Sequence, residues 1–505
     1  MLMLELRHVS LRLREEDRTL VEDLSFTLAR GDRAVLIGEE GNGKSTLLRA
    51  ICDRAAVERY CEVSGEIVSG RPGYLSQMLA PEAYGLSLAE YFADADWYGH
   101  IVLLDRMGLS PEFLCSTQRL GTLSGGERVK ARLCRLLLDD PDVLLLDEPT
   151  NDLDVETLEW LENFLCTAKQ SVLYVSHDET LIERTANVIL HLEQLGGKRT
   201  ARLTVSRRPY REYLAERRSN FAHQEQVAQK QRDDYDRQMQ KWRQIRDRVD
   251  HEQRVISRGD PSGARLLKKK MHAVQSMGRR FDRQKEDFID FPQEELAILA
   301  RFDPAVTLPA GKTVLDLSLP EIRVGERLLA RDVALHVNGG EIVGITGRNG
   351  AGKSTLLAAI WAQLRDRTDV IAAYMPQDYT EVLPPERSPV DFLARGGTKE
   401  EITRARTYLG SMRFTRPEMV GRIGRLSGGQ QAKLLFLDMV LRGANVLLLD
   451  EPTRNFSPLS APVVRAALAG FGGTIISVSH DRKYLSEVCD TVYELTETGL
   501  KRIEP

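Results

Sequence analysis

Short apolar runs with polar ends recur in both halves of the chain and predict buried β-strands. Three of them cover residues 33–37, 171–175 and 474–478, and helix-forming residues 45–51 follow the first. Two further apolar runs end in paired acids, Asp147-Glu148 and Asp450-Glu451. Strands that alternate with helical stretches predict an α/β fold.

The pattern changes to a helical one between residues 207 and 300. Apolar side chains recur there every seven residues, at Tyr235, Trp242, Val249 and Ile256. The segment 259–263 breaks this helix, with Asp260 as the N-cap and Pro261 as the first residue of a second helix. That helix carries its own apolar stripe, at Leu267, Met271, Val274 and Phe281. The two stripes predict an antiparallel hairpin, about 60 Å long if the first helix has roughly 40 residues.

Five short segments occur twice in the same order, which indicates a duplicated domain. The copies are 309 residues apart for Lys44 and Lys353, 300 for Gln77 and Gln377, and 303 for the other three segments. The last predicted strand, 491–495, lies so near the end of the sequence that we expect no C-terminal tail domain. We therefore divide the chain into a first domain at 1–206, a linker at 207–300 and a second domain at 301–505.

The first repeated segment is a glycine-rich loop between a strand and a helix, which is the context of a phosphate-binding loop. Its glycines let backbone N–H groups turn towards phosphate oxygens, and the helix N-terminus adds its dipole. Lys44 and Lys353 would reach the β- and γ-phosphates, and the serine after each would ligate Mg²⁺. The residues expected to bind nucleotide here are Gly38, Gly41, Gly43, Lys44, Ser45 and Thr46, and Gly347, Gly350, Gly352, Lys353, Ser354 and Thr355.

The acidic strand ends supply the second part of each predicted site. Asp147 and Asp450 would hold Mg²⁺, directly or through water. Their neighbours Glu148 and Glu451 would act as general bases that polarise the attacking water. Each aspartate lies 23 residues after the serine of a Leu-Ser-Gly-Gly segment, which predicts an anion site at a helix N-terminus. The residues of these two segments are Ser124, Gly125 and Gly126, and Ser427, Gly428 and Gly429.

Two further pairs of residues complete the predicted sites. His177 and His480 each lie 30 residues after the aspartate, at the end of a predicted strand, and we expect them to contact the γ-phosphate. Gln77 and Gln377 occupy matched loop positions, and we expect both to bind near the Mg²⁺ ion.

Taken in order, these motifs resemble the Walker A, Q-loop, signature, Walker B, D-loop and switch histidine of ATP-binding-cassette proteins. The resemblance covers both domains, about four-fifths of the chain. It implies two tandem ABC-type P-loop nucleotide-binding domains that pair head to tail within one chain and bind ATP with Mg²⁺. Lys44 would then face Ser427 and Gly429 across one ATP, and Lys353 would face Ser124 and Gly126 across the other. Bound ATP would close the pair, and hydrolysis would release it.

Two departures from the family pattern concern these sites. No aromatic residue for adenine stacking occurs at 11–20 or 322–329, which leaves adenine selectivity without its usual basis, although an arginine plane could stack instead. The second D-loop carries Ser457 where the first has Asp154. We therefore expect two unequal ATP sites.

The distribution of charge points to the partner. The formal net charge is −4, but residues 211–285 hold 20 Lys or Arg and 11 Asp or Glu, a local +9 that leaves −13 elsewhere. A basic rod suits a phosphate backbone, although a solvated coiled-coil face is the alternative. Because this linker has few aromatic residues that could stack on bases, we expect it to recognise the shape and charge of a nucleic acid rather than its base sequence. The residues expected to bind RNA are Arg254, Arg258, Arg265, Lys268, Lys269 and Lys270.

Two cassettes joined by a basic α-helical hairpin resemble the ABC-F proteins, which are translation factors and antibiotic-resistance proteins that bind the ribosomal E site. The resemblance implies a ribosomal partner, with a hairpin tip near 255–265 that contacts P-site tRNA and rRNA close to the peptidyl-transferase centre. The second D-loop resembles that of resistance-type members and favours ribosome protection. A housekeeping factor that relieves stalled ribosomes is the alternative.

Other function classes fit the sequence less well. No apolar run reaches 18 residues and the N-terminus lacks an apolar signal, so we expect a cytoplasmic protein without membrane contact. Because the resemblance implies that the two cassettes pair within one chain, we also expect a monomer. The ATPase subunit of a membrane transporter remains an alternative, although such a pair needs no basic hairpin of this length. DNA-repair ATPases have longer coiled coils or zinc-binding cysteines, whereas the six cysteines here are scattered and form no C-x-x-C pair.

Overall fold

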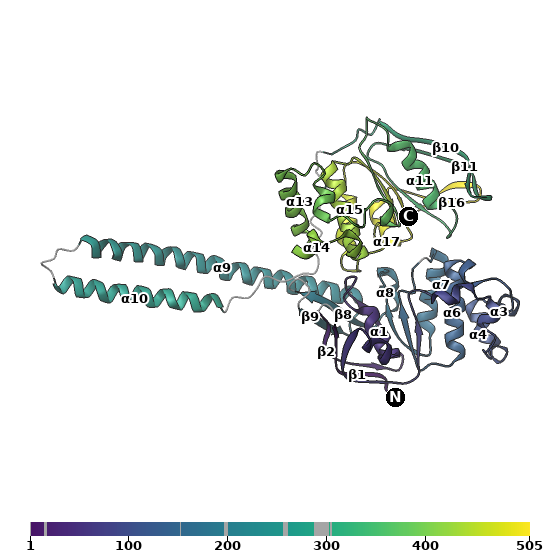
Figure 1. The fold of residues 1–505 in the computed structure, drawn as a ribbon, viewed down its shortest axis with the longest axis horizontal. Coiled ribbons are helices and arrows are strands. Elements are labelled where there is room, and N and C mark those ends of the chain that lie inside the picture. The colour runs from purple at the N-terminus through teal and green to yellow at the C-terminus, as the bar shows by residue number, and fades with distance from the viewer. Residues whose placement is uncertain are drawn as a thin grey trace. The chain divides into compact units, whose positions relative to one another are not determined.

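The computed structural model describes residues 2–14, 18–151, 153–195, 200–255, 261–286, 302 and 306–504. The chain forms two compact units, one of Met1–Tyr210 with Glu295–Pro505 and one of Arg211–Glu294. The first unit contains two α/β cassettes, and the second contains two long helices (Figure 1). The expected fold class, two tandem cassettes with a helical hairpin between them in sequence, is therefore confirmed.

The first cassette is built around a mostly parallel sheet with the strand order β5-β6-β7-β3-β8-β9, in which only the β8–β9 pair is antiparallel. The strands β6 and β7 are buried at every position, as expected for the centre of a parallel sheet. The predicted strands at 33–37 and 171–175 coincide with β3 and β7. The strands are β3 (Arg33–Ile37), β5 (Pro72–Leu75), β6 (Val143–Asp147), β7 (Ser171–Val175), β8 (Val188–Leu195) and β9 (Thr200–Ser206).

An antiparallel sheet of order β2-β1-β4 packs against the same core, with β1 at Leu2–Leu13, β2 at Arg18–Ala29 and β4 at Cys61–Ser69. Leu47 and Leu48 of the first helix are fully buried in this core, which fixes the helix behind the glycine-rich loop. The helices are α1 (Lys44–Cys52), α2 (Arg54–Glu58), α3 (Leu88–Tyr91), α4 (Ile101–Met107), α5 (Pro111–Leu114), α6 (Gly125–Leu138), α7 (Val155–Thr167) and α8 (Glu179–Thr185), with 3₁₀ turns η1 (Pro81–Gly85), η2 (Tyr98–His100) and η3 (Leu120–Thr122).

The second cassette repeats this plan, with the strand order β13-β14-β15-β12-β16-β17 and an antiparallel pair β10–β11. The predicted strand at 474–478 coincides with β15. The predicted strand at 491–495 is β16, but β17 follows it and extends the sheet. The strand β17 was missed because its sequence, Gly-Leu-Lys-Arg-Ile, contains no apolar run. The strands are β10 (Thr313–Val324), β11 (Arg327–Asn338), β12 (Ile342–Thr346), β13 (Ala372–Met375), β14 (Val446–Asp450), β15 (Thr474–Val478), β16 (Thr491–Thr496) and β17 (Gly499–Ile503).

Several helices of the second cassette follow the same motifs along the sequence as helices of the first, as α11 and α1 do after their glycine-rich loops. Its core joins α15 to the sheet through fully buried residues such as Leu434 and Leu437. The helices are α11 (Lys353–Leu364), α12 (Pro389–Leu393), α13 (Lys399–Ser411), α14 (Arg416–Val420), α15 (Gly428–Arg442), α16 (Ala461–Ala469) and α17 (Arg482–Val488), with 3₁₀ turns η4 (Tyr379–Glu381) and η5 (Ile423–Arg425).

The second unit is an antiparallel pair of helices, α9 (Tyr210–Val255) and α10 (Pro261–Glu286), seen side by side in Figure 1. Three contacts set their register: Tyr235 meets Phe281 edge to face, Trp242 Nε1 donates to the Val274 carbonyl oxygen at 2.8 Å, and Gln253 Nε2 donates to the Leu267 carbonyl oxygen at 3.2 Å. The residues on the α10 side belong to the predicted apolar stripe, and all three are buried. The expected hairpin is therefore present, and α9, with 46 residues, is longer than expected.

A network of ion pairs joins the two cassettes beside the helices α8 and α17. Arg465 is only 3% exposed, and its guanidinium contacts Glu179 at 2.7 Å and Glu487 at 2.6 Å. Lys483 contacts Glu179 at 3.0 Å, and Arg482 pairs with Glu162. Charges of both cassettes thus compensate each other in a buried place, where an unpaired charge is costly.

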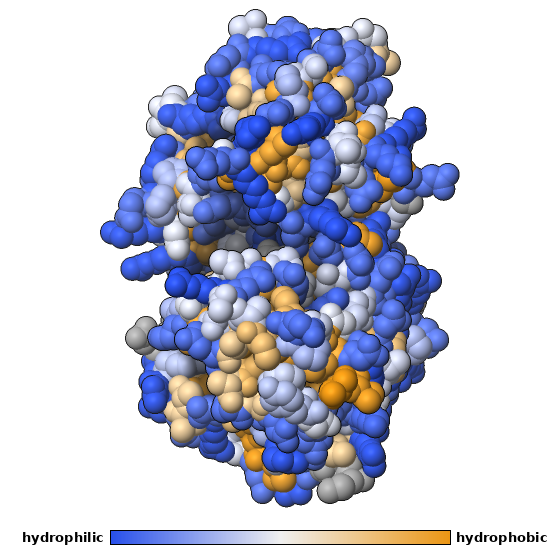
Figure 2. Space-filling model, turned by 90° about the vertical axis from the view of Figure 1, so that its right-hand side faces the viewer, coloured by the Kyte–Doolittle hydropathy of each residue, from blue (hydrophilic) through white to orange (hydrophobic). Residues whose placement is uncertain are grey.

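Two properties of the surface complete the fold. The space-filling view shows a largely hydrophilic face that is hollowed between the two cassettes (Figure 2). In the described part of the chain, no helix combines the length and the apolar character needed to cross a bilayer.

The ion-pair network leads to a prediction about stability. We expect Arg465→Met to lower the free energy of unfolding of the cassettes by about 3 kcal/mol, because it removes a buried guanidinium and leaves the buried Glu179 carboxylate with Lys483 as its remaining partner in the network. The matched control is Arg184→Met, which removes an arginine that pairs with Glu162 but is 57% exposed, and which should cost less than about 1 kcal/mol. Urea unfolding of both variants checks this difference, and equal effects would contradict it.

Candidate nucleotide-binding sites

Both glycine-rich loops adopt a backbone that glycine accepts most readily. Gly38 and Gly347 have φ angles of 149° and 142°. A Cβ atom at these two positions would lie 2.2 and 2.6 Å from backbone carbonyl oxygens. The helices α1 and α11 begin at the lysine that ends each loop. Each loop therefore leads directly into a helix N-terminus, where an anion is favoured.

The two lysines lie across their own loops. Lys44 Nζ donates to the carbonyl oxygens of Gly38 at 2.7 Å and Glu39 at 3.0 Å. Lys353 Nζ donates to the carbonyl oxygens of Gly347 at 2.8 Å and Arg348 at 2.9 Å. Both ammonium groups are buried and held in the same way, so the duplicated sequence produces a duplicated local structure.

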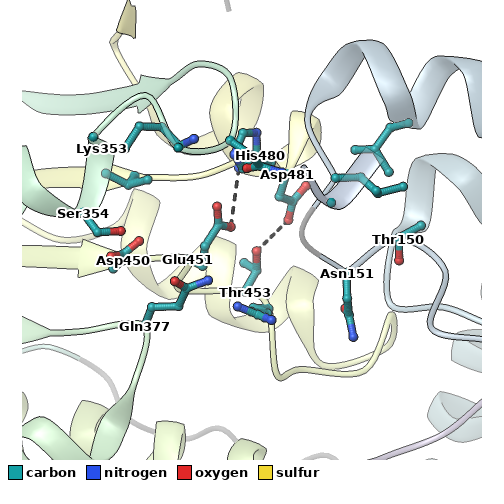
Figure 3. Close-up of a pocket in the computed structure, with 18 of the residues that line it drawn as sticks. Thr150, Asn151, Lys353, Ser354, Gln377, Asp450, Glu451, Thr453, His480 and Asp481 are labelled. Carbon is teal, nitrogen blue, oxygen red and sulfur yellow. Dashed lines mark hydrogen bonds between the residues drawn. The ribbon is translucent and has the colours of Figure 1, made fainter. Parts of the chain in front are cut away.

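A cavity of about 600 Å³ lies at the second loop and is lined by both cassettes. Figure 3 shows Lys353, Ser354, Gln377 and Asp450 on one side of it and Thr150 and Asn151 on the other. The predicted residues that line it are Gly125, His177, Gly350, Gly352, Lys353, Ser354, Thr355, Gln377, Asp450, Glu451 and His480. Ser124 instead forms a capping box with Glu127 at the start of α6, and Gly126 packs against Thr157.

The cavity also contains side chains against which an adenine ring could stack. Val324, Arg327 and Leu329 line it, and all three belong to the antiparallel pair β10–β11. Arg327 lies within the segment 322–329, in which the sequence offers no aromatic residue. The side chains available there are thus one guanidinium plane and two aliphatic groups.

Burial dominates the electrostatics of this second site. It raises the pKa of Glu451 to about 7, with the nearby Asp450 charge as the next cause. Burial also lowers the pKa of His480 to about 4, and the Lys353 ammonium adds to this. Both ring nitrogens of His480 and the Oδ2 atom of Asp450 are buried without a hydrogen-bond partner among the described residues. Such atoms suit a ligand that supplies the missing partners.

At the first site the protein supplies partners for both oxygens of Asp147 and for one oxygen of Glu148, whereas the buried Glu148 Oε2 atom has no hydrogen-bond partner among the described residues. Ser45 Oγ donates to Asp147 Oδ1 at 2.9 Å, and the Tyr74 hydroxyl donates to Asp147 Oδ2 at 3.0 Å. The ring of His177 contacts Glu148 Oε1 at 2.9 Å through Nε2. Burial opposes the charge of Glu148, but His177 beside it brings the net pKa of this carboxyl below its usual value.

Glu148 and Glu451 share an unusual backbone conformation. Their φ angles are 49° and 52°, in the left-handed region that side chains other than glycine rarely adopt. Such strain persists only where the surrounding structure holds it in place, and it is concentrated at functional sites. The two predicted general bases are therefore held alike, although their neighbours differ.

The first site is also closed by residues of the second cassette. Gly429 N donates to Glu40 Oε2 at 2.7 Å, and Ser457 Oγ donates to Glu39 Oε1 at 2.6 Å. His177 Nδ1 lies 2.8 Å from the Phe456 carbonyl oxygen. The first glycine-rich loop therefore faces the second signature and the second D-loop.

Several residues at this first site were not predicted from the sequence. Tyr74 belongs to a repeated Tyr-x-x-Gln segment, so its match with Tyr374 was an available signal. Glu39 and Glu40 stand where the second loop has Arg348-Asn349, and only a comparison of the two copies reveals them. Gln77, which was predicted to bind near the metal, is exposed at the end of β5, while Tyr74 contacts Asp147.

The predicted RNA-binding residues lie on the helical hairpin. Arg265, Lys268 and Lys269 are exposed on α10. Arg254 pairs with Asp250 at 2.7 Å, and Lys270 lies 3.8 Å from Glu252. Arg258 and the tip residues 256–260 lie outside the described residues.

Comparison with known proteins identifies the family. The family model described as ABC transporter matches residues 21–151 and 330–454, one stretch in each cassette. The chain is 29% identical to the tylosin resistance ATP-binding protein TlrC of Streptomyces fradiae, over 96% of both chains. It is 29% identical to the ATP-binding protein Uup of Haemophilus influenzae, over 94% of this chain and 76% of the relative. It is 24% identical to ABC transporter F family member 5 of Arabidopsis thaliana, over 96% of this chain and 74% of the relative.

Solved structures share the tandem arrangement. One is the complex of the archaeal ribosomal stalk protein aP1 with the archaeal ribosome recycling factor aABCE1, with a TM-score of 0.60 and 16% identity over 98% of this chain and 90% of the other. The RNase-L inhibitor gives a TM-score of 0.58 and 17% identity over the same shares. These likenesses concern the fold. The chain belongs to the ATP-binding-cassette (ABC transporter) family and is an ATPase, and the three relatives named above, which match 94% or more of this chain, are ABC-F proteins.

Proposed function

We propose that this ATPase enters the ribosomal E site in its ATP-bound, closed form and leaves when ATP is hydrolysed. While bound, it contacts P-site tRNA and rRNA near the peptidyl-transferase centre through the hairpin of α9 and α10. It acts as a cytoplasmic monomer whose two cassettes pair within one chain, and it confers antibiotic resistance by ribosome protection. A housekeeping role in relieving stalled ribosomes is the alternative.

The basic hairpin is the observation that carries this proposal. Leu267, Val274 and Phe281 are buried in the hairpin, whereas Arg265, Lys268 and Lys269 on the same helix are exposed. The apolar stripe thus accounts for helix pairing and leaves the positive charge for another partner. Phosphate groups of RNA suit such a surface, because their neutralisation releases counterions.

The residues of the second site fit ATP with Mg²⁺. The cavity has the size of a small-molecule site, and Lys353 would bind the β- and γ-phosphates. Ser354, Gln377 and the unpartnered carboxylate oxygen of Asp450 would hold Mg²⁺, which prefers oxygen ligands. When bound, the ion would neutralise charge on the phosphates. Arg327 would stack on adenine in place of an aromatic residue.

The proposed chemistry of this site requires a base and a phosphate contact. Glu451 would orient and deprotonate the attacking water, and Asp450 would remain with the metal. His480 would contact the γ-phosphate, because its buried ring nitrogens have no hydrogen-bond partner in the described part of the chain and its side chain lines the same cavity as Lys353. At the first site the corresponding roles would fall to Glu148, Asp147, His177 and Lys44.

The name of one relative supports the resistance role. TlrC is named for tylosin resistance and matches this chain over 96% of both lengths, so no large domain separates the two. Uup and the plant F family member are named for ATP binding and for the family alone. Protection against a drug is thus tested first with tylosin.

Ribosome binding is the first prediction. We expect the double variant Glu148→Gln with Glu451→Gln to co-sediment with bacterial ribosomes in ATP and not without nucleotide, because both proposed bases are lost while ATP binding is kept. The control is the same variant with Lys44→Ala and Lys353→Ala, which should stay in the supernatant. Ribosome binding in neither state would contradict the proposal, and recovery with membranes instead would favour a transporter subunit.

The hairpin provides a second prediction. We expect Lys268→Glu with Lys269→Glu to weaken ribosome binding and to reduce the salt dependence of the binding constant, by about one unit of log–log slope for each lost phosphate contact. The matched control is Lys399→Glu with Arg404→Glu, the same charge change on the exposed face of α13. In translation assays with tylosin, the hairpin variant should lose protection and the control should keep it. Equal behaviour of the two variants would contradict an RNA-binding role.

The raised pKa of Glu451 provides a third prediction. Because a general base must be deprotonated, kcat/KM of a Glu148→Gln variant should rise with pH and show an inflection near the pKa of about 7. His480, with a pKa of about 4, stays neutral across this range and adds no inflection. Residual turnover of the Glu451→Gln variant should be flat, since the pKa of Glu148 is lowered. A flat profile for the first variant would exclude Glu451 as the base.

A further inference from the structure

The two glycine-rich loops differ in charge at the positions that face the partner cassette. The first loop has Glu39-Glu40, and the second has Arg348-Asn349 at the corresponding positions. Arg348 points to Glu156 of the first cassette, at 3.5 Å between exposed side chains. Glu39 and Glu40 instead contact the second cassette at partly buried hydrogen bonds. The two loops thus share a backbone conformation but present side chains of different charge to the partner cassette.

Glu40 lies at the N-terminus of the 15-residue helix α15. Its Oε2 atom accepts the Gly429 N–H at 2.7 Å and would lie 3.0 Å from a Cβ atom built on Gly428. Ser427 is engaged with Gln430 in the capping box of the same helix. A carboxylate is therefore bound at the helix end that the proposed site assigns to the γ-phosphate, and it satisfies the same donor.

Glu39 fixes the position of this carboxylate. Its Oε1 atom accepts hydrogen bonds from Ser457 and Ser460 in the second D-loop. Burial disfavours the charge of Glu39, but Lys433 and the two serine hydroxyls hold its net pKa below the usual value. The neighbour of Glu40 is thus an anchored anion, and Ser457, which replaces the Asp154 of the first D-loop, supplies one of the anchors.

We propose that Glu40 is a specificity-determining residue that makes the first site prefer ADP to ATP, because its carboxylate occupies the γ-phosphate position at the N-terminus of α15. This inference rests on the proposed site assignment and deepens it. A diphosphate leaves the contact between Glu40 and Gly429 intact. A triphosphate must displace the carboxylate and then lie beside its negative charge. The second site has Asn349 at this position and takes ATP without such a penalty.

The contacts of Glu148 agree with this division of roles. At the first site the proposed base is paired with His177, whose other ring nitrogen contacts the carbonyl of Phe456 in the second D-loop. At the second site, among the described residues, the Glu451 carboxylate accepts from the backbone N–H of His480 at 3.4 Å and from the Ser479 hydroxyl at 3.5 Å. The proposed base of the first site is thus paired with its histidine, whereas Glu451 and His480 of the second site both line the cavity (Figure 3).

Equilibrium dialysis of the full chain with labelled ATP or ADP in Mg²⁺ tests the proposal. The parent carries Lys353→Ala, so that binding reports the first site, and Glu148→Gln, so that ATP is not hydrolysed. We expect this parent to bind ADP more tightly than ATP. Glu40→Asn, which copies the second loop, should strengthen ATP binding by at least about tenfold, as expected for losing competition with a charged hydrogen bond. It should change ADP binding by less than about twofold.

The converse exchange is the matched control. In a chain with Lys44→Ala and Glu451→Gln, Asn349→Glu should weaken ATP binding at the second site and leave ADP binding nearly unchanged. Retained ADP binding shows that each variant is folded. Equal ATP affinities with and without Glu40→Asn, or equal changes for ATP and ADP, would overturn the role of Glu40. If the Lys353→Ala parent binds neither nucleotide while the Lys44→Ala chain binds both, the first-site assignment fails and this inference falls with it.

Discussion

Two adjacent carboxylates, Asp147 and Glu148, lie buried at the end of β6, and the buried Asp450 and the partly buried Glu451 form the same pair at the end of β14. Neighbouring charges of one sign in a place that excludes water raise each other's free energy, so every group around them matters. The lysine of the glycine-rich loop, the serine after it and the histidine that follows the next strand all lie near these acids. The remaining residues of each site stabilise the negative charge of this carboxylate pair.

The same motif finds different compensation in the two cassettes. At the first site Tyr74 and Ser45 donate to the two oxygens of Asp147, His177 contacts one oxygen of Glu148, and Glu148 keeps a lowered pKa. At the second site these partners are fewer, and Glu451 has a pKa of about 7. A duplicated sequence thus produces a closed site and a receptive one, because the loops and D-loops across the interface have diverged. Together with the proposed role of Glu40, such inequality would let the first site retain a diphosphate while ATP turns over at the second.

The sequence was informative wherever a local pattern carried the structure. Continuous apolar runs located β3, β7 and β15, and the heptad spacing located the paired helices α9 and α10. Ser354, Gln377 and Asp450, which the matched spacing assigned to one site, line the cavity beside Lys353, whereas Ser124 and Gly126 are not among its described lining residues. The contacts of Glu39 and Glu40 could not be predicted in this way, because their partners lie 418 and 389 residues away and depend on how the cassettes pair. Edge strand β17 was missed because it lacks the buried pattern that identifies its neighbours.

The left-handed backbone of Glu148 and Glu451 has a consequence for how such a protein evolves. Glycine adopts this conformation without strain, so the fold alone would favour glycine at both positions. The proposed hydrolysis requires a carboxylate at both positions, so selection must act against a substitution by glycine that would relieve backbone strain. Replacement of either glutamate by glycine would therefore abolish hydrolysis at that site while relieving backbone strain. Inactive, well-folded descendants of this cassette should arise more readily than unfolded ones.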